Sequence, residues 1–213
     1  MIYIVYPDDP STAFLKPIVT SLQASGVELH VIKVEASDDS YKSAFEEVNN
    51  ISKSAFTMFM GHGTDDELLG GESSNFKRKP FIKKNEMGIF KQKDVLFLSC
   101  NSEGLIKNAR RIAGFSSSLS FGALPTSYQE VENNRKLNKL GLTNDSIDEF
   151  KEILVNSVLE AVQYSLGKDC SLETVYNYLR LLINRKISSL VLEDNNTSLA
   201  NLLFQVKQEM TYC

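Results

Sequence analysis

The sequence contains little of what a metal-binding or disulfide-linked protein needs. Its three cysteines, Cys100, Cys170 and Cys213, are widely spaced, and no CxxC pair or cluster of histidines lies beside them. This spacing favours neither a disulfide framework nor a zinc site, so we expect no metal and no cofactor. The two histidines, His30 and His62, are the only imidazoles available for proton transfer.

Long apolar runs and an excess of positive charge are also missing. No stretch approaches the roughly 18 apolar residues of a membrane-spanning helix, and residues 1–6 lack the basic start and cleavage site of a secretory signal. The net charge of −4 gives no general reason to expect a nucleic-acid or anionic-membrane partner. We therefore expect a cytoplasmic protein that binds neither nucleic acid nor membranes.

The composition that remains is that of an ordinary folded domain. Hydrophobic residues make up 42% and charged residues 23% of the 213 positions. A chain of this length can bury a sizeable core. We expect a single domain over residues 1–213, with an α/β core in residues 1–125 and a mainly helical completion in residues 126–213.

Apolar strands and amphipathic helices alternate along the first part of the chain. The sequence predicts strands at residues 1–6, 27–34, 55–60, 94–99 and 116–121. Helices are predicted from Ser11, as the N-cap, to Gly26, and at residues 37–52 and 102–113. This alternation indicates an α/β fold with a mostly parallel sheet of about five or six strands.

The C-terminal third is predicted to be helical. The short segment at residues 189–192 is predicted to add an edge strand. The periodicity of apolar residues predicts helices at residues 147–166, 172–187 and 198–210.

Residues 64–93 form a long polar excursion, with a β-hairpin as one reading. The basic run at residues 76–84 is compatible with a phosphate-binding strip, but a solvated, mobile loop is favoured because nothing beside it stacks on bases or reads them. The acidic side chains that follow His62 are similarly expected to solvate the loop rather than orient the imidazole or bind a cation; these are Asp65, Asp66, Glu67 and Glu72.

His62 and Cys100 each follow a strand that is almost continuously apolar. Such strands are covered on both faces, which places them at the centre of a sheet. Ligands of open α/β sheets bind beyond the carboxyl ends of the strands. Neighbouring strands would therefore bring the two side chains within reach of each other, whereas His30 lies inside an alternating strand, where a packed or surface imidazole is expected.

The pair has the chemistry of a cysteine nucleophile and its base. A histidine can deprotonate the thiol and then protonate a leaving amine. The helix that starts at Ser102 is expected to lower the pKa of Cys100. The backbone N–H groups of Gly63 and Cys100 could form an oxyanion hole.

The segments FMGHG (59–63) and LFLSCNS (96–102) resemble the caspase–gingipain–separase superfamily of cysteine peptidases, in which a strand ending in His-Gly precedes one ending in a small residue and Cys. They look most like its bacterial CHAT branch, whose motif commonly reads Ala/Ser-Cys-x-Ser. The resemblance implies a three-layer sandwich, a catalytic dyad of His62 and Cys100, and cleavage of a protein or peptide substrate through a thioester.

Specificity is less well indicated by the resemblance. The caspase signature QACxG is absent, so specificity for aspartate is not implied. In metacaspases and their kin an acidic residue two positions before the cysteine helps to recognise Arg or Lys, but Leu98 occupies that position here. In this superfamily the turn after the first strand borders the specificity pocket, and Asp8 or Asp9 could hold a basic substrate side chain there. The same two residues would equally suit a turn and a helix start.

Two other classes of protein remain to be weighed. A latent or degenerate caspase-like module could act as a protein-interaction scaffold through its helical third, or could await an activating protein partner that orders residues 64–93. A flavodoxin-like small-molecule domain is disfavoured, because no glycine-rich phosphate loop follows the first strand and the segment PDDP (7–10) is acidic.

Overall fold

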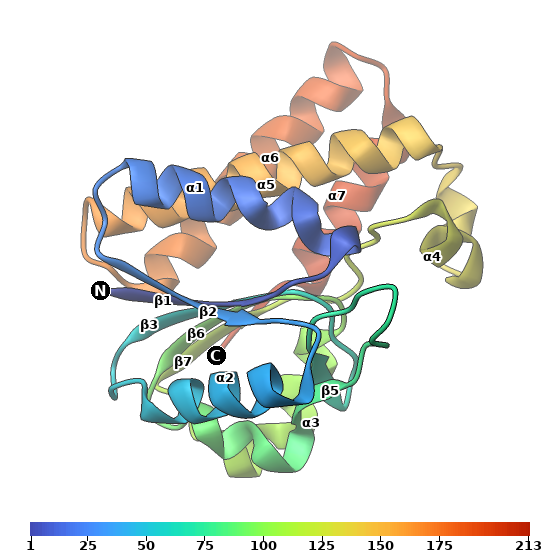
Figure 1. Cartoon of the computed structure of the whole chain (residues 1–213). Coiled ribbons are helices and arrows are strands. Elements are labelled where there is room, and N and C mark those ends of the chain that lie inside the picture. Colours follow the sequence, from blue (N-terminus) through green and yellow to red (C-terminus); the bar gives the residue numbers. More distant parts are fainter.

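A six-stranded sheet runs through the centre of the computed structural model, which describes all residues, Met1–Cys213 (Figure 1). Its strands follow the order β2-β1-β3-β6-β7-β8. The first five are parallel, and only β8 at one edge is antiparallel. Their bounds are β1 (Ile2–Pro7), β2 (Leu29–Val34), β3 (Phe56–Met60), β6 (Asp94–Leu98), β7 (Ser117–Ser120) and β8 (Thr211–Tyr212).

Helices cover both faces of the sheet, so the predicted mostly parallel α/β sandwich of three layers is confirmed (Figure 1). One outer layer contains α2 (Asp38–Asn50), α3 (Ser102–Ala113) and the 3₁₀ helix η2 (Lys84–Phe90). The other outer layer contains α1 (Lys16–Ala24), α5 (Asn144–Leu166), α6 (Leu172–Leu192) and α7 (Thr197–Glu209).

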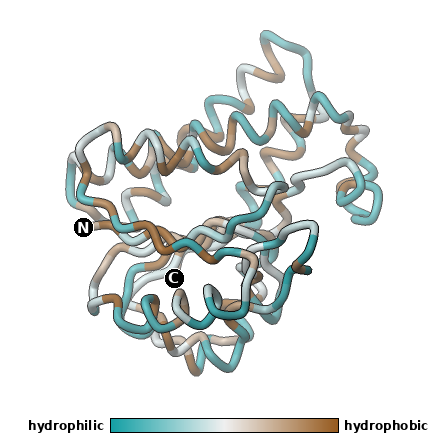
Figure 2. Tube along the Cα trace, viewed as in Figure 1, coloured by the Kyte–Doolittle hydropathy of each residue, from teal (hydrophilic) through white to brown (hydrophobic).

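The central strands send alternate side chains into two separate hydrophobic cores. In β3, Met58 belongs to the cluster of 37 buried residues under α1, α5, α6 and α7. Its neighbour Phe59 belongs to the cluster of 20 buried residues under α2 and α3. Because both faces are buried, the strands are apolar at nearly every position, whereas the outer helices alternate between hydrophobic and hydrophilic residues (Figure 2).

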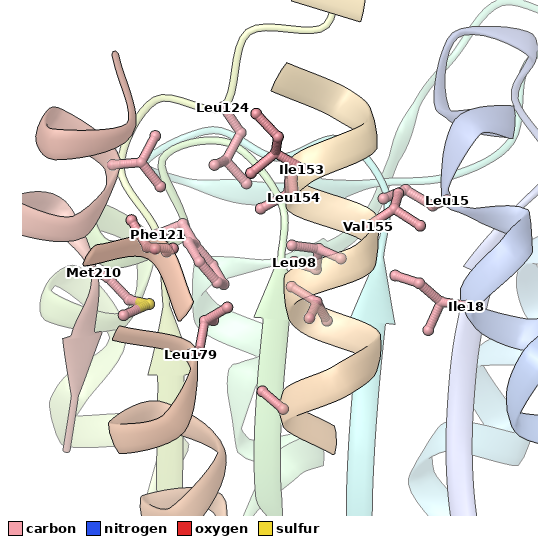
Figure 3. Packing of buried hydrophobic residues seen from close by; sticks show 14 of the residues in the cluster. Leu15, Ile18, Leu98, Phe121, Leu124, Ile153, Leu154, Val155, Leu179 and Met210 are labelled. Atoms are coloured by element: carbon pink, nitrogen blue, oxygen red, sulfur yellow. The ribbon is translucent and has the colours of Figure 1, made fainter. Parts of the chain in front are cut away.

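The helical C-terminal part completes the larger core rather than standing apart from the sheet. Figure 3 shows Leu179 of α6 and Met210, which directly follows α7, near Leu98 of β6 and Phe121, which follows β7; all four are buried in this cluster. None of the helices is both long and apolar enough to cross a membrane.

Two details at the sheet edge differ from the sequence prediction. The edge strand predicted at residues 189–192 is wrong, because α6 continues to Leu192 and its helical period buries Leu190 against the core. The edge strand lies instead at Thr211–Tyr212, which pairs with β7 in antiparallel register.

The long segment after His62 contains the predicted hairpin. Strands β4 (Glu67–Leu69) and β5 (Pro80–Lys83) pair in antiparallel register. The hydroxyl of Tyr41 in α2 donates to the carbonyl of Gly71 at 2.8 Å, so the hairpin is tied to the sheet's outer layer. This segment therefore has an ordered path over the carboxyl ends of the strands.

Candidate active site

His62 and Cys100 end neighbouring strands at the same level of the sheet. β3 and β6 are parallel partners, with Met60 opposite Leu98, and each candidate residue follows its strand by two positions. Both side chains line one cavity of about 260 Å³ at the carboxyl edge of the sheet. The structure thus brings the two predicted residues into one site.

A buried serine fixes the turn that carries Cys100. The hydroxyl of Ser102 lies 2.9 Å from the carbonyl oxygen of Ser99 and accepts a hydrogen bond of 3.0 Å from the N–H of Phe121. Asn101, which lies between Ser99 and Ser102 in the chain, has a positive φ of 54°, and its N–H donates to the carbonyl oxygen of Gly122. Left-handed backbone at a residue other than glycine persists where surrounding contacts impose it, and these contacts hold Cys100 in the wall of the cavity.

Ser11 is the direct partner of His62. Its hydroxyl oxygen lies 2.6 Å from His62 Nε2 and 2.6 Å from Asp9 Oδ1. An ionised carboxylate only accepts, so the Ser11 hydroxyl donates to Asp9 and accepts from the Nε2–H of His62. This arrangement leaves His62 Nδ1 as the nitrogen with a free lone pair.

Arg78 holds Asp9 in its charged form. The guanidinium places Nε at 2.8 Å and Nη2 at 2.6 Å from Asp9 Oδ2, and Nη2 is also 2.9 Å from a carboxylate oxygen of Glu72. Burial alone would raise the pKa of Asp9, but the hydrogen bonds of Ser11 and the charge of Arg78 keep this pKa below its usual value. The basic run therefore contributes one anchored arginine rather than only a solvated loop.

His62 is held in its neutral form. Burial lowers the pKa of the imidazole, the nearby positive charge of Arg78 lowers it further, and the carboxylates of Asp9, Glu130 and Glu72 only partly oppose these effects. A neutral imidazole with a free nitrogen can accept a proton near neutral pH.

Cys100 is a protonated thiol in this conformation. Burial, with the negative charge of Glu130, raises the pKa of Cys100 to about 12. The thiol donates to the carbonyl oxygen of Leu124 at 2.9 Å. The expectation that the start of α3 lowers this pKa is therefore wrong, because desolvation outweighs the helix terminus, whose Glu103 N–H is already bonded to Phe121.

No hydrogen bond joins His62 to Cys100; each side chain bonds to a different neighbour. Leu124, the partner of the thiol, belongs to the loop after β7 and packs against Leu154 of α5 (Figure 3). The two groups share the cavity in a resting arrangement, and proton transfer between them requires the thiol to leave Leu124.

The two predicted oxyanion donors are not bonded to other residues. Neither the N–H of Gly63 nor that of Cys100 donates to a backbone carbonyl, and the Cys100 N–H meets only its own thiol. Gly63 lies so close to the cysteine turn that a Cβ there would be 3.0 Å from the Cys100 carbonyl oxygen and from Ser99 Oγ. The absence of a side chain at Gly63 thus allows the close approach of the two strand ends.

The predicted substrate-binding pair lies outside the cavity. Neither Asp8 nor Asp9 is among its lining residues. Asp9 is 3% exposed and its oxygens are occupied by Ser11 and Arg78, whereas Asp8 is exposed. Asp9, and not Ser11, caps the helical segment after β1, the 3₁₀ helix η1 (Pro10–Leu15).

Three residues of the site were not predicted in their roles: Ser11, Arg78 and Glu130. Ser11 was assigned to helix capping, although β1 lies beside β3 and its following turn must therefore meet His62. Arg78 lies in a basic run whose residues look alike in the sequence. Glu130 lies in the connection between the sheet and the long helices, where no motif distinguishes it. No protein-family model and no curated protein matches the chain.

Proposed function

We propose that the chain is a caspase-like cysteine peptidase that cleaves a protein or peptide substrate with Cys100 as nucleophile and His62 as base. The observation that carries this proposal is the placement of both side chains, from adjacent strand ends, in one cavity beside two N–H groups that bond to no other residue. A thiol, a neutral imidazole and paired amide donors are the groups that acyl transfer through a thioester needs.

The proposed reaction begins with transfer of the Cys100 proton to His62 Nδ1. The thiolate then attacks the substrate carbonyl carbon, and the negative oxygen that forms accepts hydrogen bonds from the N–H groups of Gly63 and Cys100. Collapse of this intermediate breaks the C–N bond, and His62 returns the proton to the leaving amine, which leaves a thioester on Cys100. Water, deprotonated by His62, attacks the thioester to release the carboxylic acid and the thiol.

Ser11 and Asp9 stabilise this cycle without touching the substrate. When Nδ1 takes up the proton, the imidazole becomes positively charged. The Nε2–H then donates to Ser11, whose own proton points to the ionised Asp9 carboxylate. This chain fixes the ring orientation and places a negative charge 4.0 Å from Nε2.

A second candidate is a latent or degenerate module that serves as a protein-interaction scaffold. The observation that favours it is the resting state of Cys100, protonated and bonded to Leu124 rather than to His62. A partner protein that draws the loop containing Leu124 away from the thiol would convert such a module into an active peptidase.

The proposal also places the protein in the cytoplasm, where three free thiols stay reduced.

The proposal is tested by labelling the folded protein with a peptidyl acyloxymethyl ketone and identifying the modified cysteine by mass spectrometry. We expect modification at Cys100 that is lost in His62→Ala and retained in His30→Ala, which removes an exposed imidazole. Cys170 and Cys213 are exposed and serve as internal references for ordinary thiol reactivity. Modification of these two with Cys100 untouched in the folded protein, even with candidate partners added, would leave the scaffold as the better account.

A further inference from the structure

A loop over Cys100 decides whether the thiol is available. The carbonyl oxygen of Leu124, in the middle of the loop at residues 122–126, accepts a hydrogen bond from the Cys100 thiol at 2.9 Å. His62 bonds to a different neighbour, so proton transfer within the pair requires the thiol to leave this carbonyl. The groups that hold the loop in place therefore maintain the resting arrangement.

Two carboxylates hold the loop by its backbone. Glu130, in the short helix α4 (Tyr128–Asn133), accepts from the N–H of Thr126 at 2.6 Å. Glu209, the last residue of α7, accepts from the N–H of Ala123 at 3.2 Å. Hydrogen bonds to charged groups are stronger than those between neutral groups. The two carboxylates thus fix the loop on both sides of its middle residue.

The two carboxylates connect the loop to different parts of the molecule. Glu130 follows Thr126 by four positions and belongs to the same local segment, whereas Glu209 lies 86 positions after the residue whose N–H it accepts. The Glu209 side chain fills the space beside Gly122, where an added Cβ would lie 2.6 Å from the Glu209 Cβ. Its other carboxylate oxygen lies 3.3 Å from Nζ of Lys136. Glu209 therefore joins the loop to α7 and to the strand that follows α7.

The strand after Glu209 is short and is packed on one face. β8 has two residues, lies at the edge of the sheet and pairs with β7 alone. On one face Tyr212 stacks on Tyr176 of α6, with ring centroids 5.6 Å apart. On the other face Thr211 lines a cavity of about 320 Å³ beside α3. Such an edge strand separates from a sheet at a smaller free-energy cost than a central strand.

We propose that residues 209–213, here called the latch, hold the loop at residues 122–126 against Cys100, and that detachment of the latch frees the thiol to meet His62. When the latch leaves, the Ala123 N–H loses its acceptor and the loop loses its connection to α7. The carbonyl that holds the thiol can then move away, and water reaches the sulfur atom. The inference names the regulation of the proposed peptidase site and rests on that function for its meaning in catalysis.

Alkylation by iodoacetamide at pH 8 measures how readily the latch leaves. In Glu209→Ala we expect Cys100 to react roughly tenfold faster than in the wild type, since the Ala123 N–H has lost a charged acceptor. Gln208→Ala changes an exposed neighbour in α7 and should react like the wild type. The exposed Cys170 is the internal reference and should keep its rate in every variant.

A second control separates release of the loop from a general loss of stability. Val48→Ala removes buried methyl groups from the core under α2, in the other outer layer. It should lower the free energy of unfolding without a change in the rate at Cys100. A rate at Cys100 that is unchanged in Glu209→Ala, or that rises equally in Val48→Ala, would overturn the latch.

A disulfide tests the latch in the closed direction. Ser118 of β7 and Cys213 exchange two backbone hydrogen bonds, of 2.8 and 2.9 Å, so their side chains lie opposite each other on one face of the sheet. Ser118→Cys therefore brings two thiols within disulfide distance. The oxidised variant should react at Cys100 several-fold more slowly than the same protein after reduction. Equal rates in the two states would contradict release of the loop by detachment of the latch.

Failure of the latch and failure of the peptidase proposal give different results. Alkylation by iodoacetamide needs no peptidase activity, so the expected rates support the latch even in a protein that cuts no peptide. Unchanged rates in Glu209→Ala, together with peptide cleavage that depends on Cys100, would overturn the latch and leave the peptidase proposal standing.

Discussion

The hydroxyl oxygen of Ser11 lies 2.6 Å from Nε2 of His62, although 51 positions separate the two residues in the chain. The contact exists because β1 and β3 are parallel neighbours, so the turn after β1 meets the residues that follow β3. The contact indicates that Nε2 of His62 carries the proton. Through Asp9 and Arg78 it also connects the imidazole to the hairpin that covers the sheet edge.

Removing the Ser11 hydroxyl should slow catalysis without unfolding the protein. In Ser11→Ala the imidazole loses its orienting partner, and we expect kcat, or the rate of Cys100 labelling, to fall roughly tenfold with little change in KM. Ser11→Thr should restore most of the rate because it keeps the hydroxyl. Thr20→Ala, on the exposed side of α1, is the matched control. A rate in Ser11→Ala equal to that of the wild type would show that the contact has no role in proton transfer.

Loss of Arg78 should destabilise the fold, because Asp9 would remain buried without its cation. We expect Arg78→Met to lower the free energy of unfolding by about 2–3 kcal/mol, less than for a fully buried pair because the arginine is partly exposed. Lys77→Met, an exposed neighbour, should change it little. Urea denaturation measures both. Adding Asp9→Asn to Arg78→Met should recover part of the loss, and a double variant less stable than Arg78→Met would argue against an unpaired carboxylate as the cause.

The raised pKa of Cys100 predicts a resting protein with an unreactive site thiol. At pH 8 iodoacetamide should alkylate the exposed Cys170 much faster than Cys100, and the rate at Cys100 should continue to rise as the pH approaches about 12. In the unfolded chain the thiol has its ordinary pKa of 9.0, so the folded state binds more protons above that pH. Stability should therefore decrease as the pH rises beyond 9.0, and this decrease should be smaller in Cys100→Ala. Rapid alkylation of Cys100 at pH 8 in the absence of any ligand would contradict the resting state described above.

Gly63 should not tolerate a side chain. The Cβ of Gly63→Ala would press on the Cys100 carbonyl and Ser99 Oγ, and we expect a loss of about 1 kcal/mol of stability together with a large fall in activity. Gly167→Ala is the control, since a Cβ there meets nothing closer than 3.7 Å. Thermal unfolding and peptide hydrolysis measure the two effects. Full activity in Gly63→Ala would contradict the idea that the Gly63 N–H serves as an oxyanion donor only when the two strand ends lie this close together.

The sequence was sufficient for the features that local pattern and strand polarity determine. Continuous apolar runs identify the central strands, and the polarity of parallel strands then places His62 and Cys100 at one edge. Contacts between distant segments could not be obtained in this way. Ser11 has the composition of a helix cap, and only its position beside β3 gives it another role.

The same limit explains the pKa of Cys100 and the end of α6. The helix start at Ser102 is a local signal, whereas the burial that overrides it comes from the loop of Leu124 and from α5. The segment at residues 189–192 contains Val191, a residue common in strands, but burial of Leu190 in the core continues the helix. In both cases tertiary burial outweighs a local preference.

Digestion of a peptide library by the wild type and by Cys100→Ala tests the central claim most directly. The account predicts discrete cleavages by the wild type, with or without an added partner, that all disappear in Cys100→Ala while its fold is retained. The same cleavages in both proteins would contradict it, as would a wild type that neither cuts any peptide nor reacts with any peptidyl electrophile at Cys100.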